Sequence, residues 1–166
     1  MLNGHGDDLQ RYKNIRINFS SNVYNHFNHD GLFAHLAACL PRVVNYPEPA
    51  PVSLERKLAS MLDLTPAEVM VTNGATEAIY LIAQAFQGAA SSILQPTFAE
   101  YQDACRMFGH KLDSDDEDMI WLCNPNNPTG LTIDKDDLLA IISENRNTTY
   151  VIDASYAAFT LQPLIS

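Results

Sequence analysis

The sequence predicts an α/β fold with a mostly parallel sheet and helices on both faces. Short apolar stretches alternate with longer amphipathic ones, the apolar stretches are not interrupted by polar residues, and turn formers separate the two kinds. With 166 residues, of which 46% are hydrophobic and 18% charged, the chain is long enough to bury a core. Parallel sheets bind ligands at the carboxyl ends of their strands, so the residues that follow each strand are the first candidates for a site.

Residues 1–52 are expected to form an N-terminal arm without regular structure. They are rich in Asn, His and Gly, and near their end lies the string Y-P-E-P-A-P, whose prolines remove hydrogen-bond donors and fix φ. From Ser53, the expected N-cap, to about Asp63 the apolar residues recur at helical spacing and predict an amphipathic helix. The string T-P-A-E at residues 65–68 has capping-box spacing and predicts one further helical turn.

The remaining chain, within an expected domain of residues 53–166, alternates between strands and helices. We predict strands at residues 69–72, 92–95, 119–123 and 149–153. We predict helices at residues 76–86, 99–108 and 135–145.

Composition argues against several classes of function. A formal charge of -10 would repel a phosphate backbone, so nucleic acid is not expected as a partner. No stretch approaches the roughly 20 consecutive apolar residues of a membrane helix, and the first residues lack a signal-peptide pattern, so we expect a cytoplasmic protein. The three cysteines and five histidines have no metal-ligand spacing, and no metal site is predicted.

Unusual residues follow the first two predicted strands. The string N-G-A-T-E after the first is a small-residue turn that opens a helix, where free N–H groups and the helix dipole suit an anion, although any strand-to-helix turn favours small residues. Phe98 follows the second strand, where it would either stack on a flat ring or pack as an ordinary core residue.

The last two predicted strands also end in polar residues. The third is followed by N-P-N-N-P-T-G, whose asparagines offer side-chain donors beyond what a generic loop requires. The fourth ends in Asp153, with Tyr156 three residues later. A carboxylate at the end of a buried strand is costly unless it is paired, so Asp153 requires a partner.

Four ordered strings, N-G-A-T-E-A-I, P-T-F-A-E-Y, C-N-P-N-N-P-T-G and D-A-S-Y, resemble the motifs of fold-type I aminotransferases of class I/II, within the branch of histidinol-phosphate aminotransferase and threonine-phosphate decarboxylase. The resemblance implies an aspartate aminotransferase-like large domain, pyridoxal 5'-phosphate (PLP) as cofactor and a homodimer. By this resemblance, Gly74, Ala75 and Thr76 would bind the cofactor phosphate, and Phe98 would stack on the pyridine ring. Asn127 and Tyr156 would hydrogen-bond the phenolic oxygen, and Asp153 would pair with the ring nitrogen. Tyr46 would reach the phosphate of the neighbouring subunit's cofactor.

Two features depart from that family. Its members attach PLP through a Schiff base to a lysine well after the D-x-x-Y motif, whereas Lys13, Lys57, Lys111 and Lys135 match no such motif. We therefore expect a fragment of a longer enzyme, inactive by itself and without the small C-terminal domain. The connection at residues 110–118 is also shorter than the resemblance implies.

The N-terminal arm favours one reaction. G-H-G-D and I-N-F-S-S-N resemble the arm of threonine-phosphate decarboxylases, which make the aminopropanol phosphate linker of cobalamin, and the chain lacks the N-E-N-P string usual in histidinol-phosphate aminotransferases. L-threonine-O-3-phosphate decarboxylase is the favoured interpretation, and histidinol-phosphate aminotransferase or another class I/II aminotransferase is the alternative. His5 and Asn22 are candidates for contacting a phosphorylated amino acid, or they satisfy only backbone groups. A non-catalytic binding domain would have no need for the carboxylate of Asp153.

Overall fold

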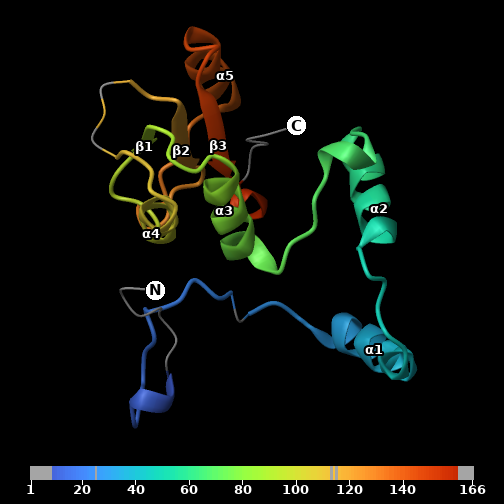
Figure 1. Cartoon of the computed structure of the whole chain (residues 1–166). Helices are drawn as coiled ribbons and strands as arrows, with labels where there is room; N and C mark the ends of the chain where they lie inside the picture. Colours follow the sequence, from blue (N-terminus) through green and yellow to red (C-terminus); the bar gives the residue numbers. More distant parts are fainter. Residues whose placement is uncertain (1–8, 25, 113, 115, 161–166) are drawn as a thin grey trace. The chain divides into compact units, whose positions relative to one another are not determined.

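The computed structural model describes residues 9–24, 26–112, 114 and 116–160. The chain divides into two compact units, Met1–Ser53 and Leu54–Ser166. Figure 1 shows its helices and strands in sequence colours.

The N-terminal unit contains a helix, α1 (Asp30–Cys39), with the 3-10 helices η1 (Leu9–Arg11) before it and η2 (Leu40–Val44) after it. The prediction that this region lacks regular structure was wrong for α1. Its sequence D-G-L-F-A-H-L-A-A-C is rich in leucine and alanine, which are strong helix formers. At its start the N–H of Asp30 donates to Oδ1 of Asn28 at 2.8 Å. The prediction gave too much weight to the polar residues on either side.

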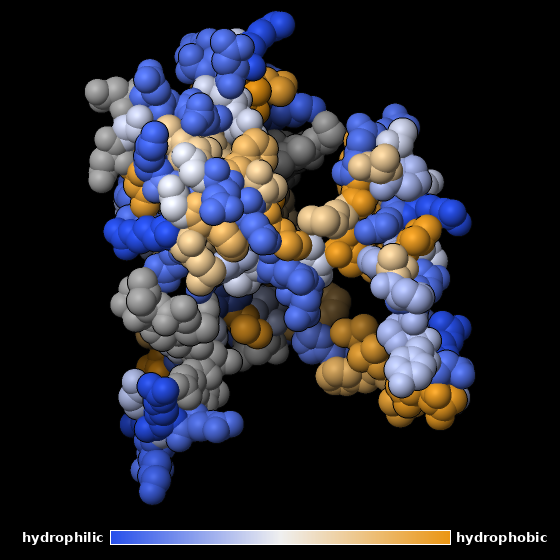
Figure 2. Space-filling model, viewed as in Figure 1, coloured by the Kyte–Doolittle hydropathy of each residue, from blue (hydrophilic) through white to orange (hydrophobic). Residues whose placement is uncertain are grey.

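Neither α1 nor η2 contains a buried residue. Figure 2 shows the resulting apolar surface in orange. The large apolar side chains exposed on these two helices are Leu32, Phe33, Leu36, Leu40, Val43 and Val44.

The second unit follows the predicted order of helices and strands, except for the strand expected at residues 69–72. Its helices are α2 (Val52–Leu62, which starts in the last residues of the first unit), η3 (Pro66–Glu68), α3 (Gly74–Ala85), α4 (Glu100–Met107), α5 (Lys135–Glu144) and η4 (Ala157–Phe159). Its strands are β1 (Ser91–Ile93), β2 (Met119–Cys123) and β3 (Thr149–Asp153). The last two strands have the predicted bounds, and α2, η3, α3, β1, α4 and α5 differ from the predictions by one to two residues at an end. η4 was not predicted.

Helix starts confirm one capping prediction and correct another. The capping box before η3 is present: the N–H and hydroxyl of Thr65 donate to Oε2 of Glu68 at 2.8 and 2.7 Å. Ser53 is not an N-cap, because α2 already begins at Val52 and the N–H of Ser53 donates to Oε2 of Glu48 at 3.0 Å.

The three strands form one parallel sheet in the order β1-β2-β3. Cys123 lies opposite Asp153, so the carboxyl ends of β2 and β3 are level. In Figure 1 the strands lie between α5 on one side and α3 and α4 on the other. Because all strands run the same way, the loops after them converge on a single edge of the sheet.

Residues 69–72 do not form the predicted strand. Among the described residues no strand pairs with them, and the N–H of Val71 donates to Oε1 of Glu55 in α2 at 3.2 Å. An apolar run alone does not form a strand, because its backbone N–H and carbonyl groups must also pair with the backbone of a neighbouring strand.

The core of the second unit lies where α3 and α4 pack on the sheet. It consists of Ile79, Ala83, Tyr101, Ala104, Cys105, Met119 and Trp121. Burial raises the pKa of the Cys105 thiol to about 11, against a smaller lowering by its hydrogen bond with Ser91.

A buried histidine joins the end of α3 to β1. Nε2 of His110 lies 2.8 Å from the carbonyl oxygen of Ala83, near the C-terminus of α3. A carbonyl only accepts, so Nε2 carries a proton, and in the neutral ring Nδ1 accepts from the Ser91 hydroxyl at 2.7 Å. The imidazole thus satisfies one carbonyl at the end of the helix and a buried hydroxyl of the strand.

The Tyr80 hydroxyl in α3 donates to Oε2 of Glu100 at 2.8 Å. This hydrogen bond, and less so burial, raises the pKa of Tyr80 to about 12 from an ordinary value near 10. A phenol whose folded pKa is raised contributes stability below its unfolded pKa and loses it as the pH rises through the folded one. We expect the difference in free energy of unfolding between wild type and Tyr80→Phe to be constant up to pH ~10 and to shrink towards pH ~12. Denaturant unfolding of both proteins across this pH range measures it, and a constant difference to the highest pH would contradict the pairing.

Candidate functional site

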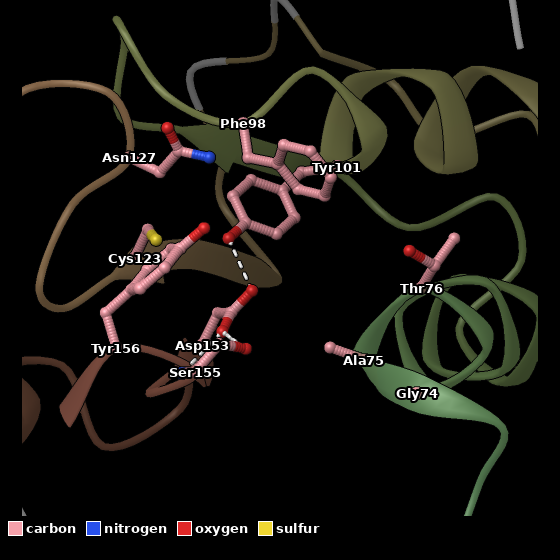
Figure 3. Close-up of a pocket in the computed structure, with 10 residues that line it drawn as sticks. All are labelled: Gly74, Ala75, Thr76, Phe98, Tyr101, Cys123, Asn127, Asp153, Ser155 and Tyr156. Atoms are coloured by element: carbon pink, nitrogen blue, oxygen red, sulfur yellow. Dashed lines mark hydrogen bonds between the residues drawn. The ribbon is translucent and has the colours of Figure 1, made fainter. Parts of the chain in front are cut away.

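A pocket lies at the carboxyl ends of β2 and β3, where the start of α3 faces the loops after the strands. Figure 3 shows α3 on one side, Phe98 and Tyr101 above, and Asn127 and Tyr156 opposite α3. Asp153 and Ser155 lie beneath the Tyr101 ring. The residues that line the pocket are Gly74, Ala75, Thr76, Phe98, Tyr101, Cys123, Asn127, Asp153, Ser155 and Tyr156.

The start of α3 offers backbone donors to this pocket. The first N–H groups of a helix have no acceptor within it, and the helix dipole adds partial positive charge. The N–H of Gly74 donates to the carbonyl of Thr72 at 2.9 Å, which leaves those of Ala75 and Thr76 as the first-turn donors that helix geometry makes available. Figure 3 shows the Thr76 side chain on the face of α3 towards the pocket.

Gly74 is required by its backbone conformation. Its φ is +81°, in the left-handed region that strains other residues. A Cβ at this position would meet no atom within 4 Å, so room is not the constraint. The fold by itself therefore favours glycine here, because the turn that enters α3 has this conformation.

Aromatic rings form one wall of the pocket. The Phe98 ring meets the Tyr101 ring edge-on, with centroids 5.8 Å apart and planes at 80°. Tyr101 in turn stacks on Trp121, with centroids 5.8 Å apart and planes at 24°. Tyr101 and Trp121 are each 1% exposed, whereas Phe98 is half-buried and lines the pocket. Phe98 therefore rests on a fixed base and can offer surface to a ligand.

The asparagines after β2 have different tasks. Asn124 is 0% exposed, and its Oδ1 and Nδ2 bond the N–H and the carbonyl of Ile133, both at 2.9 Å. The Asn124 side chain thus pairs with the backbone of Ile133 as a neighbouring strand would. Asn127 instead lines the pocket, and Figure 3 shows its amide near Phe98.

Asn126 fastens two loops to each other. Its Oδ1 accepts from the Thr97 hydroxyl at 2.7 Å, and its Nδ2 donates to the carbonyl of Pro96 at 2.9 Å. Nδ2 also lies 2.8 Å from the hydroxyl oxygen of Thr129. The loop that carries Phe98 and the loop that carries Asn127 are therefore held together.

Asp153 has hydrogen-bond partners on both carboxylate oxygens. Its Oδ2 accepts from the Tyr101 hydroxyl at 2.7 Å. Its Oδ1 accepts from the N–H and the hydroxyl of Ser155, at 2.9 and 2.6 Å. The expectation that this half-buried carboxylate needs partners is met by protein groups, and it also lines the pocket.

The structure brings together the predicted site residues of the second unit, which are Gly74, Ala75, Thr76, Phe98, Asn127, Asp153 and Tyr156. Asn22 and Tyr46 belong to the N-terminal unit, where both are exposed, and Tyr46 is fully so. His5 lies outside the described residues. The roles assigned to all of these residues stay predictions.

Sequence reasoning missed three pocket residues, Tyr101, Cys123 and Ser155. All three lie within motifs that had been noted: Tyr101 ends P-T-F-A-E-Y, Cys123 begins C-N-P-N-N-P-T-G and Ser155 lies in D-A-S-Y. The usable signal was the position of these residues inside motifs that follow strand ends, where parallel strands gather their ligand-binding residues.

The Aminotransferase class I and II family model matches residues 14–114 and 110–165. The chain belongs to this family. The two matched segments overlap at residues 110–114. These residues begin the connection that is shorter than the resemblance implies. Pyridoxal phosphate is the family's cofactor.

The chain is similar to three relatives in particular. The solved structure of L-threonine-O-3-phosphate decarboxylase from Porphyromonas gingivalis is 38% identical, with a TM-score of 0.82 over 88% of this chain and 51% of that one. Histidinol-phosphate aminotransferase from Caldanaerobacter subterraneus subsp. tengcongensis is 31% identical over 72% of this chain and 41% of its own length. The adenosylcobalamin biosynthesis bifunctional protein CobDQ of Leptospira interrogans is 27% identical over 86% of this chain and 19% of its own length.

These likenesses confirm the predicted fold: part of the large domain of the PLP-dependent aminotransferases, with a mostly parallel sheet. The chain spans about half or less of the length of these relatives. In the part of the chain that the structure describes, no helix is long and apolar enough to cross a membrane.

Proposed function

We propose that this chain supplies a PLP cradle to an enzyme that acts on a phosphorylated amino acid. One observation carries the proposal: the start of α3 and the carboxylate of Asp153 line the same pocket, with Phe98, Asn127 and Tyr156 around it. The pocket thus offers anion donors, an aromatic face and a carboxylate in one place. A phosphorylated pyridine ring needs those three kinds of group.

The phosphate fits the start of α3. The N–H groups of Ala75 and Thr76, the Thr76 hydroxyl and the helix dipole all favour an anion there. Gly74 sets the turn that points them towards the pocket. The residues implied by the family motif are therefore of the right chemistry for this end of the cofactor.

The ring fits the opposite side. Phe98 would stack on the ring, Asn127 and Tyr156 would donate to the phenolic oxygen, and Asp153 would pair with the ring nitrogen, since all four line the pocket. A carboxylate within a few ångströms favours the protonated, cationic nitrogen. When bound, PLP supplies an electron sink for a carbanion at the substrate's alpha carbon. The residues of this chain hold and orient it, and Asp153 keeps the nitrogen's proton in place.

Substrate and reaction are proposed from the relatives. We favour decarboxylation of L-threonine-O-3-phosphate, in cobalamin biosynthesis, because the arm motifs and a 38% identical decarboxylase both support it. Transamination of histidinol phosphate is the second candidate, supported by a 31% identical aminotransferase. In the decarboxylase interpretation His5 and Asn22 contact the substrate.

The N-terminal unit is proposed as a dimer contact. Its α1 and η2 expose apolar side chains, and Tyr46 is fully exposed, as expected for a residue that reaches another subunit's cofactor phosphate. Residues 1–52 would then act as an arm and residues 53–166 as part of the large domain. The lysine that carries the cofactor is proposed to lie outside this chain.

The test is a pair of assays on the purified protein encoded by the complete gene, loaded with PLP. We expect carbon dioxide release from L-threonine-O-3-phosphate, and no amino transfer from glutamate to the imidazole keto-phosphate. Amino transfer without gas release would favour the second candidate. Absence of PLP absorbance after reconstitution, together with inactivity in both assays, would contradict the cradle itself.

A further inference from the structure

We propose that Tyr101 is a positioning residue for Asp153: its buried hydroxyl orients the carboxylate so that one acceptor site on Oδ2 is left for a ring nitrogen. This inference rests on the proposed PLP cradle and adds to it a residue that would act only through Asp153. Three observations carry it, and they concern the rigidity of the tyrosine, the acceptor sites of the carboxylate and the protonation of the hydroxyl.

The Tyr101 hydroxyl is held in a fixed place. Its side chain is 1% exposed, stacks on Trp121 and meets Phe98 edge-on. It comes from α4, while Asp153 ends β3, so the bond between them joins a helix to the sheet. Because the tyrosine ring is packed on both sides, its hydroxyl cannot move if the carboxylate rotates. The hydrogen bond therefore holds only while the carboxylate keeps one orientation.

The acceptor sites of Asp153 are almost filled by protein. A carboxylate has about four lone-pair sites, two on each oxygen. Oδ1 accepts two hydrogen bonds from Ser155, and Oδ2 accepts one from Tyr101. The remaining site is on Oδ2, the oxygen that Tyr101 holds. Without that hydroxyl, Oδ2 would have two open sites, and the carboxylate would be held through Oδ1 alone.

The Tyr101 hydroxyl remains a donor. Its pKa is raised, first by burial and then by hydrogen bonds with Cys123 and Asp153. The phenol therefore keeps its proton at neutral pH, where it donates to an acceptor. Cys123 also lines the pocket, and its thiol donates to the carbonyl of Pro125 at 3.2 Å, which leaves Asp153 as the charged acceptor of the phenol.

The test is Tyr101→Phe in the protein encoded by the complete gene, because phenylalanine keeps the ring stack and removes only the hydroxyl. We expect the apparent Kd for PLP, measured by titrating the apoprotein, to rise about tenfold, the order expected for one hydrogen bond to a charged group. The visible circular dichroism of the bound cofactor should fall, because the ring is less firmly oriented. Tyr80→Phe is the matched control: it also removes a phenol that donates to a carboxylate, at 2.8 Å from Glu100, outside the pocket. It should leave both readouts at the wild-type values.

A double-mutant cycle shows whether Tyr101 acts through Asp153. In an Asp153→Ala background we expect Tyr101→Phe to leave the Kd for PLP unchanged. A full effect in that background would overturn the inference, and so would a lowered Tm of Tyr101→Phe with unchanged Kd and dichroism, which is the result for a purely structural hydroxyl. If Asp153→Ala itself changes no PLP readout, the proposed cradle fails as well. If only Tyr101→Phe is without effect, the cradle stands and this inference fails.

Discussion

Replacing Asp153 with alanine is expected to lower kcat/KM about 10²–10³-fold, the range for removing one preorganised electrostatic group from an active site. The reason is that no other acidic side chain lines the described pocket, so no nearby carboxylate can hold the proton of a ring nitrogen. The assay is the gas-release reaction of the reconstituted protein. The pH dependence of the cofactor's absorbance gives a second readout, and we expect it to shift in the variant.

Asp153→Asn separates charge from shape. Its amide oxygen can still accept from Tyr101, so the packing around it changes little, but the negative charge is lost. We expect this variant to be nearly as inactive as Asp153→Ala. Activity close to wild type would show that the charge at this position has no part in the reaction.

Asn124→Ala is expected to reduce the free energy of unfolding by about 1–3 kcal/mol. The substitution removes two hydrogen bonds at a fully buried site and leaves the N–H and the carbonyl of Ile133 without their partner. A buried polar group without a partner costs about 1–3 kcal/mol, and the two groups of Ile133 are half-buried, so together they cost about as much as one fully buried group. Denaturant unfolding of the protein encoded by the complete gene measures the change.

Asn127→Ala is the matched control, three residues further along the same loop. Asn127 lines the pocket, and we propose that it bonds the cofactor. We expect Asn127→Ala to weaken PLP binding and to change the free energy of unfolding by less than about 0.5 kcal/mol. If the two variants exchanged these phenotypes, the division of tasks between the asparagines would be wrong.

Local patterns were sufficient for most of the second unit. β2 and β3 were predicted with the bounds that the structure shows, because a strand inside a parallel sheet has an apolar run bounded by turn residues. The polar residues after the strands were recognised as neighbours because parallel strands all end at one edge. The same reasoning failed in two places. Residues 69–72 are mostly apolar but have no neighbouring strand to pair with among the described residues, and α1 forms from helix-forming residues within a polar region.

The sequence by itself determined the order of strands and helices, the family, and which motifs meet at the strand ends. Only the tertiary structure decided what each polar residue in those motifs does. Asn124 and Asn127 are identical in chemistry, yet one bonds the backbone of Ile133 and the other lines the pocket. Tyr101 was predicted only as a residue of a helix, whereas in the structure its hydroxyl also donates to Asp153, which is distant in the chain. Hydrogen-bond partners far apart in sequence are set by how the elements pack, because direction and distance decide whether a bond forms, and no local pattern encodes either.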